Sequence, residues 1–299
     1  MIGTSTGEIA ALGTACCWVM TSLFFAHAGA RIGSFSVNLI RLAIAFPMLC
    51  IVGLVIRGVA LPTDASSELW FWLSISGLIG FVFGDMCLFR AFVLLGPRLS
   101  SLIMATAPLM TALIGYLILG EGLGVYASGG MLLTIGGVLW AVLDRKASIG
   151  AKHQEKRKLG ILLAFGGALG QAGGLVLSKY GMDQYDAFAA TQIRVLASFV
   201  GWLVIFAVTR HWTQLTLAFR DAKALRMTAI GAFFGPVLGV GLSLYAVQHA
   251  NTGVAASIMS ITPILLIPIS VFFYKERVGT GGVVGTFLAV SGVAVLFVI

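Results

Sequence analysis

Residues 90–121 read RAFVLLGPRLSSLIMATAPLMTALIGYLILGE, and residues 245–276 read YAVQHANTGVAASIMSITPILLIPISVFFYKE. Each stretch contains Ile-Met, a proline four residues after the Met, and a glutamate 13 residues after the proline; the two lie 155 residues apart. A proline inside a helix removes a backbone donor and disturbs the preceding turn. Its occurrence twice, at one spacing and in the same surroundings, indicates a duplicated unit.

The duplication extends beyond these motifs. Over residues 103–138, 10 of 36 positions are identical to those 155 residues later, Pro108 and Pro263 among them. At an offset of 153, Arg41 matches Arg194. Apolar composition alone would align Leu and Val by chance, but it would not align rare residues such as Arg and Pro. We therefore interpret the chain as two related halves.

The composition indicates lipid as the solvent. The chain has 299 residues, of which 59% are hydrophobic and 10% charged, and its mean hydropathy is +1.02. A soluble domain carries about 25% charged residues. The four cysteines all fall within apolar runs and show neither a disulfide framework nor metal-ligand spacing. We expect them to act as small apolar residues, and we expect no bound metal.

Ten apolar runs have about the length that spans a bilayer. They lie at about 7–28, 35–56, 69–93, 99–119, 123–143, 159–180, 187–209, 225–248, 253–274 and 278–298. None shows the alternation of a membrane strand, so the predicted fold is an all-α integral membrane protein. We divide it into a first five-helix repeat (1–143), a basic linker (144–158) and a second five-helix repeat (159–299).

The basic residues predict the orientation. Of the 19 Lys and Arg residues, 14 lie in the loops that join spans 1–2, 3–4, 5–6, 7–8 and 9–10, and the opposite side holds only Arg57 and Lys179. The positive-inside rule places the first set in the cytoplasm, so the 144–158 loop is predicted cytoplasmic and both termini outside. The N-terminus has no basic n-region, and we expect no signal peptide. The net charge of +8 is explained by topology and lipid contact, which argues against a nucleic-acid partner.

An odd number of spans in each half predicts that the second half inserts upside down. Inverted repeats are a recurring design of secondary transporters, with the substrate site near the midplane where the repeats meet. Two similar halves can rock between inward and outward openings. Pro108 and Pro263 are then either hinges in spans 4 and 9 or passive kinks.

The pattern of a small polar residue, an apolar run, Pro, about a dozen apolar residues and Glu, found at Pro108–Glu121 and Pro263–Glu276, resembles the EamA repeat. Two such repeats over ten spans resemble the drug/metabolite transporter superfamily. The resemblance implies a ten-helix carrier in the bacterial inner membrane, in which spans 1–4 and 6–9 surround a cavity and spans 5 and 10 are peripheral. It also implies that many members export amino acids or related metabolites. It assigns no role to Asp85.

Charged residues within spans are costly and are candidates for function. Asp85 lies in span 3 and could bind a substrate ammonium or carry a coupling proton; alternatively it forms a salt bridge to Arg90 or Arg41. Arg41 and Arg194 could be bidentate forks for a carboxylate or phosphate. The alternative for both arginines is structural, through snorkelling or capping of a neighbouring helix.

Four polar or aromatic residues complete the predicted substrate site. Trp18 and Gln171 occupy equivalent places near the middle of spans 1 and 6, the depth at which such transporters bind substrate. Tyr245 and Gln248 lie one turn apart near the end of span 8 and could form a rim. For each of the four, ordinary packing is the alternative.

The favoured function is a secondary transporter of small metabolites, with the lipid bilayer as its surroundings and protons as a possible coupling ion. No GxxxxGK[ST] loop for ATP is present, and we expect no cofactor. A passive channel or lipid scramblase is the alternative, although polar residues are sparse for a channel. A membrane-embedded enzyme is disfavoured because no HExxH motif, nucleophile–base set or carboxylate pair occurs.

Overall fold

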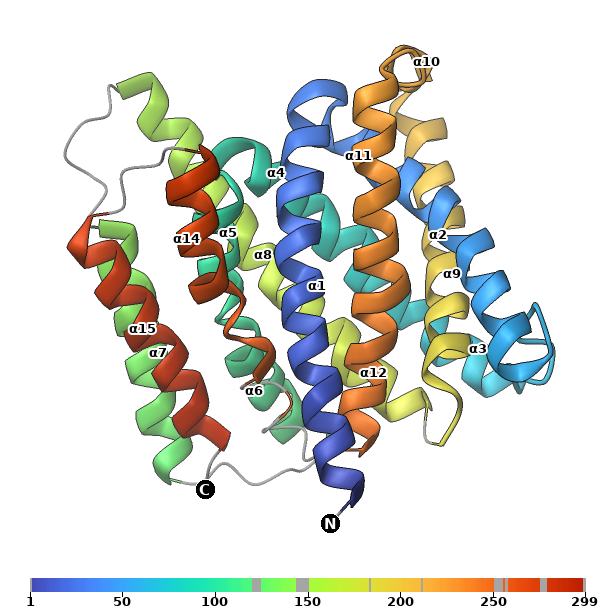
Figure 1. Ribbon diagram of the computed structural model, residues 1–299, viewed down its shortest axis with the longest axis horizontal. Helices are drawn as coiled ribbons and strands as arrows, with labels where there is room; N and C mark the ends of the chain where they lie inside the picture. Colours follow the sequence, from blue (N-terminus) through green and yellow to red (C-terminus); the bar gives the residue numbers. More distant parts are fainter. Residues whose placement is uncertain are drawn as a thin grey trace.

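The computed structural model describes residues 2–119, 125–143, 151–182, 184–210, 212–249, 255, 258–274 and 279–297, and the elements within these ranges are helices (Figure 1). In chain order they are α1 (Ile2–Ile32), α2 (Ser34–Arg57), α3 (Ser67–Gly77), η1 (Leu78–Gly84), α4 (Asp85–Leu95), α5 (Pro97–Met104), α6 (Ala107–Leu119), α7 (Val125–Leu143), α8 (Ala151–Met182), α9 (Ala187–Thr209), α10 (Trp212–Ala218), α11 (Ala222–Ala232), η3 (Phe233–Gly239), α12 (Val240–His249), α14 (Thr262–Tyr274) and α15 (Thr280–Phe297).

Seven stretches of the described residues are long and apolar enough to cross a membrane, namely Thr6–Ile32, Ser34–Arg57, Ser67–Leu95, Pro97–Leu117, Glu155–Met182, Ala187–Thr209 and Ala222–His249. Thr280–Val295 forms a shorter apolar helix. The prediction of an all-helical membrane protein is confirmed to this extent. Part of the predicted span 253–274 lies outside the described residues, and the total of ten spans stays a prediction.

The predicted linker differs from the structure at one end. α8 begins at Ala151, so the second part of the 144–158 stretch is helical, and residues 144–150 lie outside the described ranges. The sequence QEKRK at 154–158 consists of strong helix formers, which extend the apolar helix beyond its membrane-sized part. Four of the basic residues placed in this loop therefore lie on the first turns of α8, namely Lys152, Lys156, Arg157 and Lys158.

The two halves run in opposite directions. In Figure 1, α1 rises from the end where the N-terminus lies, whereas α8, its counterpart, descends toward that end. α7 and α15 pack side by side, and their contacts mirror each other. A Cβ on Gly137 would meet the Gly285 carbonyl oxygen at 2.6 Å, and one on Gly292 would meet the Gly130 carbonyl oxygen at 2.7 Å. Gly292 lies 155 residues after Gly137, and Gly285 lies 155 residues after Gly130, as expected of antiparallel helices related by an internal two-fold axis.

Each half also breaks its helices at equivalent places. The π-helices η1 and η3 occupy residues 78–84 and 233–239, at the offset of 155 found in the sequence. Helix geometry is also interrupted by turns at residues 105–106 and 260–261. Pro108 and Pro263 are the second residues of the helices that follow. There the missing N–H costs little, because the first amides of a helix have no intrahelical acceptor. The prolines thus begin helices, whereas the sequence suggested a bend within continuous ones.

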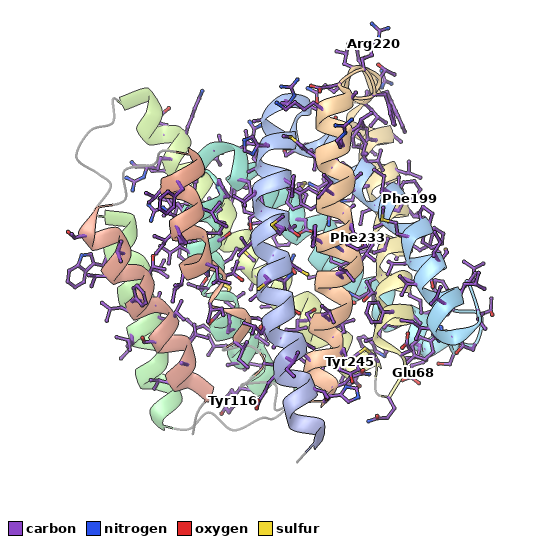
Figure 2. All side chains as sticks on the ribbon, viewed as in Figure 1. Glu68, Tyr116, Phe199, Arg220, Phe233 and Tyr245 are labelled. Atoms are coloured by element: carbon purple, nitrogen blue, oxygen red, sulfur yellow. The ribbon has the colours of Figure 1, made fainter. Side chains whose placement is uncertain are left out.

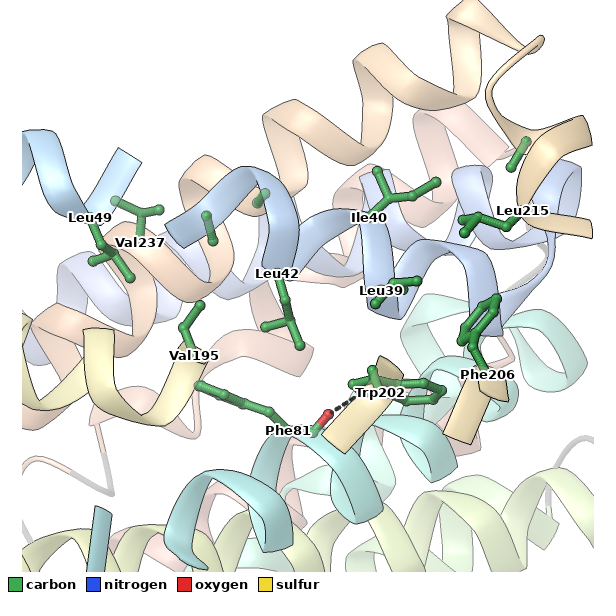
Figure 3. Packing of buried hydrophobic residues seen from close by; sticks show 13 residues of the cluster. Leu39, Ile40, Leu42, Leu49, Phe81, Val195, Trp202, Phe206, Leu215 and Val237 are labelled. Atoms are coloured by element: carbon green, nitrogen blue, oxygen red, sulfur yellow. Dashed lines mark hydrogen bonds between the residues drawn. The ribbon is translucent and has the colours of Figure 1, made fainter. Parts of the chain in front are cut away.

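Apolar packing holds α2 and α9 against η1. The main cluster contains Leu42 and Phe206, and the indole Nε1 of Trp202 donates a 3.0 Å hydrogen bond to the Phe81 carbonyl at its centre (Figure 3). That carbonyl belongs to η1, and in a π-helix the normal backbone ladder is displaced. A side chain from the second half therefore satisfies a backbone acceptor of the first half.

Close contact between α4 and α8 depends on glycine. A Cβ on Gly170 would lie 2.4 Å from the Gly84 Cα, which is far inside van der Waals contact. We expect Gly170→Ala to lower the free energy of unfolding by about 1–3 kcal/mol, the usual cost of overpacking. The measurement is the melting temperature of the purified protein in detergent. Gly136→Ala is the matched control, because a Cβ there meets nothing within 4 Å. Equal melting temperatures for the two variants would contradict the close approach.

Candidate functional site

A cavity of about 180 Å³ lies between the two halves. Its walls come from α1, α2, η1, α4, α5 and α6 of the first half and from α8, α9, η3, α12 and α14 of the second. Among the described residues, α7 and α15 contribute no wall. Since the two π-helices and both helix breaks border this space, the irregular backbone lines a cavity, as expected within a membrane.

Asp85 is the central acidic group of the cavity. Asp85 is the first residue after η1, and it is only 4% exposed. Oδ2 accepts a 2.5 Å hydrogen bond from Arg41 Nη2, and Oδ1 accepts a 2.7 Å bond from Gln171 Nε2. The glycine contact between Gly84 and α8 brings Gln171 within reach. Of the two salt-bridge partners considered from sequence, the structure shows Arg41 and leaves Arg90 exposed.

The Arg41 guanidinium makes hydrogen bonds and ring contacts with several neighbouring residues. Its Nε donates to Asn38 Oδ1 at 3.2 Å, and Nη2 donates to the Phe81 carbonyl at 3.4 Å in addition to Asp85. The guanidinium carbon also lies 4.7 Å from the centre of the Phe89 ring, a distance typical of a cation–π contact. Arg41 therefore joins α2 to η1 and α4, and its role in binding substrate stays a prediction.

Arg194, the sequence counterpart of Arg41, lies in the same cavity but in different surroundings. It projects from α9, is 3% exposed, and places its guanidinium carbon 4.7 Å from the centre of the Phe81 ring. Its Nε has no hydrogen-bond partner among the described residues. The two arginines belong to different halves and lie 153 residues apart in the sequence. In the structure, both line the cavity beside Phe81 and Asp85. Sequence alone could not show this convergence.

The remaining predicted site residues divide into two groups. Trp18 and Gln171 line the cavity, as do Pro108 and Pro263. Trp18 packs close to Gly239, where a Cβ would lie 3.2 Å from the indole Cδ1. The structure therefore brings Trp18, Arg41, Asp85, Gln171 and Arg194 to one space. Their role in binding substrate stays a prediction.

Tyr245 and Gln248 do not line the cavity. Tyr245 lies at the lower end of α12 in Figure 2 and stacks on His249, with ring centres 4.0 Å apart. The Gln248 amide donates a 2.8 Å hydrogen bond to the Tyr185 carbonyl. Both residues pack at the helix end.

The cavity also contains residues that the sequence did not single out. Phe25, Phe81, Phe89 and Phe92 form much of its apolar wall, and Thr21 contributes a hydroxyl. In a chain with 20 phenylalanines, nothing in the pattern separates a cavity phenylalanine from one that faces lipid. In the structure the π-helix η1 directly precedes Asp85, and π-helical turns are frequent at functional sites, but the sequence gives no sign of it.

Polar contacts connect the two halves at both ends of the bundle. At the end where α11 begins, Arg31 Nε donates a 2.8 Å bond to Asp221, whose carboxylate also caps α11. At the other end the Tyr185 hydroxyl donates a 3.0 Å bond to Asp64, which also pairs with Arg57. Each end thus carries polar contacts between the halves that water can reach.

The contact between Tyr185 and Asp64 predicts a pH dependence. Burial, reinforced by the bond to Asp64, raises the pKa of Tyr185 to about 12. A raised pKa favours the neutral phenol, so the bond is fully present below about pH 10, the usual Tyr value, and is lost as pH rises through about 12. The difference between the ultraviolet titrations of the wild type and Tyr185→Phe is expected to show a late phenolate. Asp64→Asn is expected to move this ionisation toward about 10, and a wild-type transition near 10 would contradict the contact.

The arrangement defines a class of protein. Apolar helices of membrane-spanning length, inverted halves and a cavity between them are the architecture of a membrane transporter. The sequence profile of the EamA-like transporter family matches residues 5–143 and again residues 158–298. The chain therefore belongs to the EamA-like transporter family, within the drug/metabolite transporter superfamily.

Similar proteins agree with this assignment. A WAT1-related chloroplastic protein of Arabidopsis thaliana, At3g02690, is 25% identical over 277 residues, which cover 89% of this chain and 63% of that protein. The uncharacterized transporter YetK of Bacillus subtilis (strain 168) is 26% identical over 140 residues, or 46% of this chain and 41% of YetK. The chain thus spans less than two thirds of the length of either relative. A solved crystal structure with 17% identity has the same fold, with a TM-score of 0.66 and 98% of both chains covered.

Proposed function

We propose that the protein is a secondary active transporter that exports small metabolites, namely amino acids or related compounds, across the bacterial inner membrane by alternating access. One observation carries the proposal: a cavity with buried charged groups lies where the two inverted halves meet. A site shared by both halves can open to one side when they rock one way and to the other side when they rock back.

The contacts at the two ends support alternating access over a passive pore. Arg31–Asp221 and Tyr185–Asp64 connect the halves at opposite ends, and each is exposed enough to exchange with water. A carrier breaks one such contact while it keeps the other, whereas a channel or scramblase needs a continuous path. Asp85 is the one carboxylate among the described cavity residues, and it is the proposed group for proton coupling.

The release of solutes from liposomes tests the proposal. Purified protein is reconstituted with an internal mixture of amino acids, nucleosides and cationic drugs, and mass spectrometry follows their release with and without an imposed pH gradient. We expect saturable release of one class, accelerated by the gradient. Unsaturable release of many solutes would favour a channel and overturn the proposal, as would the absence of release of every compound.

A further inference from the structure

The cavity contains one more positive than negative side chain among its described residues, since Arg41 and Arg194 face the single carboxylate of Asp85. Both oxygens of that carboxylate already accept hydrogen bonds, one from Arg41 and one from Gln171. Arg41 is further bound to Asn38 and to the Phe81 carbonyl. The pair Arg41–Asp85 is therefore complete, and the surplus charge belongs to Arg194.

Arg194 is buried, and the one carboxylate beside it among the described cavity residues, Asp85, already pairs with Arg41. It is 3% exposed, its Nε has no hydrogen-bond partner among the described residues, and its guanidinium carbon lies 4.7 Å from the centre of the Phe81 ring. A guanidinium carries five N–H donors and stays charged at all pH values relevant to proteins. Burying such a group unpaired is costly, and native proteins retain an arrangement of this kind where function needs it.

The surroundings of Arg194 fit the carboxylate of an apolar molecule. The cavity wall is built largely from Trp18 and phenylalanine side chains. The first residues of α6 and α14, Ala107 and Thr262, also border this space. A helix begins with a positive partial charge, and half-helices that start inside a membrane face anionic substrate groups in other carriers. Charge and wall together favour an apolar anion over an apolar cation.

We propose that Arg194 is the anion-binding residue of the cavity and holds the carboxylate of an apolar ligand, which selects carboxylates over compounds that carry only an ammonium. This inference about Arg194 rests on the proposed function, because it takes the same cavity as the transport site. It gives the two equivalent arginines different roles: Arg41 stabilises the fold, and Arg194 binds the ligand.

Binding to the wild-type protein in detergent gives the first test. The probes are 3-phenylpropanoate, L-phenylalanine and 2-phenylethylamine, which share one apolar body and differ in their charged groups. A ligand that binds only the folded state raises the melting temperature with its concentration. We expect the two carboxylates to raise the melting temperature and the amine to leave it unchanged. Equal or stronger stabilisation by the amine would overturn the proposal, and so would silence from all three probes.

Variants give the second test. Arg194→Gln is expected to raise the dissociation constant of 3-phenylpropanoate on the order of 10- to 100-fold, as expected for losing charge-assisted hydrogen bonds. Arg90→Gln is the matched control, since Arg90 is exposed and outside the cavity lining. The ligand-free Arg194→Gln protein is expected to melt at or above the wild-type temperature, because it loses an unpaired buried charge. If that variant does not fold, Arg194→Lys replaces it, with weaker binding expected from the loss of the bidentate fork.

The two proposals fail in different ways. Carboxylate binding that depends on Arg194, without movement of any solute across liposomes, would contradict the proposed transport and leave this inference standing. Saturable transport with unchanged 3-phenylpropanoate binding in Arg194→Gln would overturn the inference and leave the transporter standing.

Discussion

Asp85→Asn is expected to lower the free energy of unfolding by about 3–5 kcal/mol, the usual cost of removing one partner of a buried ion pair. The substitution keeps the shape of the side chain but removes the only carboxylate among the described cavity residues. Arg41 and Arg194 would then both be buried with no carboxylate among the described cavity residues to balance their charge. The expected consequence is a sharply lower melting temperature and little folded protein in detergent extracts.

A matched control is available at Asp64, a carboxylate that also pairs with an arginine but is half exposed. Exposed ion pairs contribute about 0–1 kcal/mol, so Asp64→Asn is expected to melt close to the wild type. The double variant Asp85→Asn/Arg41→Gln should melt above Asp85→Asn alone, since it removes the uncompensated charge together with its partner. If Asp85→Asn melted like the control, the Arg41–Asp85 ion pair would not stabilise the fold.

The second large effect is expected on rate. Pro108→Ala and Pro263→Ala each restore a backbone donor beside the helix breaks at residues 105–106 and 260–261. A backbone hydrogen bond contributes about 1 kcal/mol. Two new bonds would stabilise continuous helices and raise the barrier between cavity openings. Since 1.4 kcal/mol is about tenfold in rate, the double variant is expected to turn over about 10- to 30-fold more slowly.

The turnover number is measured as the rate of solute release from liposomes, and ligand affinity is measured by thermal stabilisation in detergent. We expect the affinity to change little, because neither proline offers a donor to a ligand. Pro268→Ala is the matched control, as this proline lies within α14, is exposed and has no counterpart in the first half. Turnover at the wild-type rate in the double variant would mean that the breaks are passive features of the fold.

Much of the fold could be predicted because the bilayer permits few solutions. Apolar runs of sufficient length must be helices, since lipid offers no partner for backbone polar groups. The repeat predicted an inversion that the mirrored contacts of Gly137 and Gly292 display. Helix ends were less predictable. α8 extends into the expected linker, because helix formers outside the membrane continue an existing helix at little cost.

The site could be predicted in its members but not in its arrangement. Rarity within an apolar chain was enough to single out Arg41, Asp85 and Arg194. Which arginine pairs with Asp85 depends on η1, whose altered register turns the Phe81 carbonyl and the Asp85 side chain toward α2. A π-helix leaves no composition signal.

The central claim is that the cavity opens to the two sides of the membrane in turn, and cysteine accessibility tests it most directly. Cys16, Cys17, Cys50 and Cys87 are first replaced, and Thr21→Cys then serves as a reporter inside the cavity. The control is Phe272→Cys on the outer face of α14, where Phe272 is 80% exposed and expected to face lipid.

Each end of the bundle is then locked in turn with a short bifunctional thiol reagent, through cysteines at Asp64 and Tyr185 or at Arg31 and Asp221. A membrane-impermeant thiol label is applied from one side at a time. The account predicts that the Thr21→Cys reporter is labelled only from the side opposite the lock, and that the side reverses when the lock is moved. Labelling that ignores both locks, or that comes from one side under all conditions, would contradict alternating access.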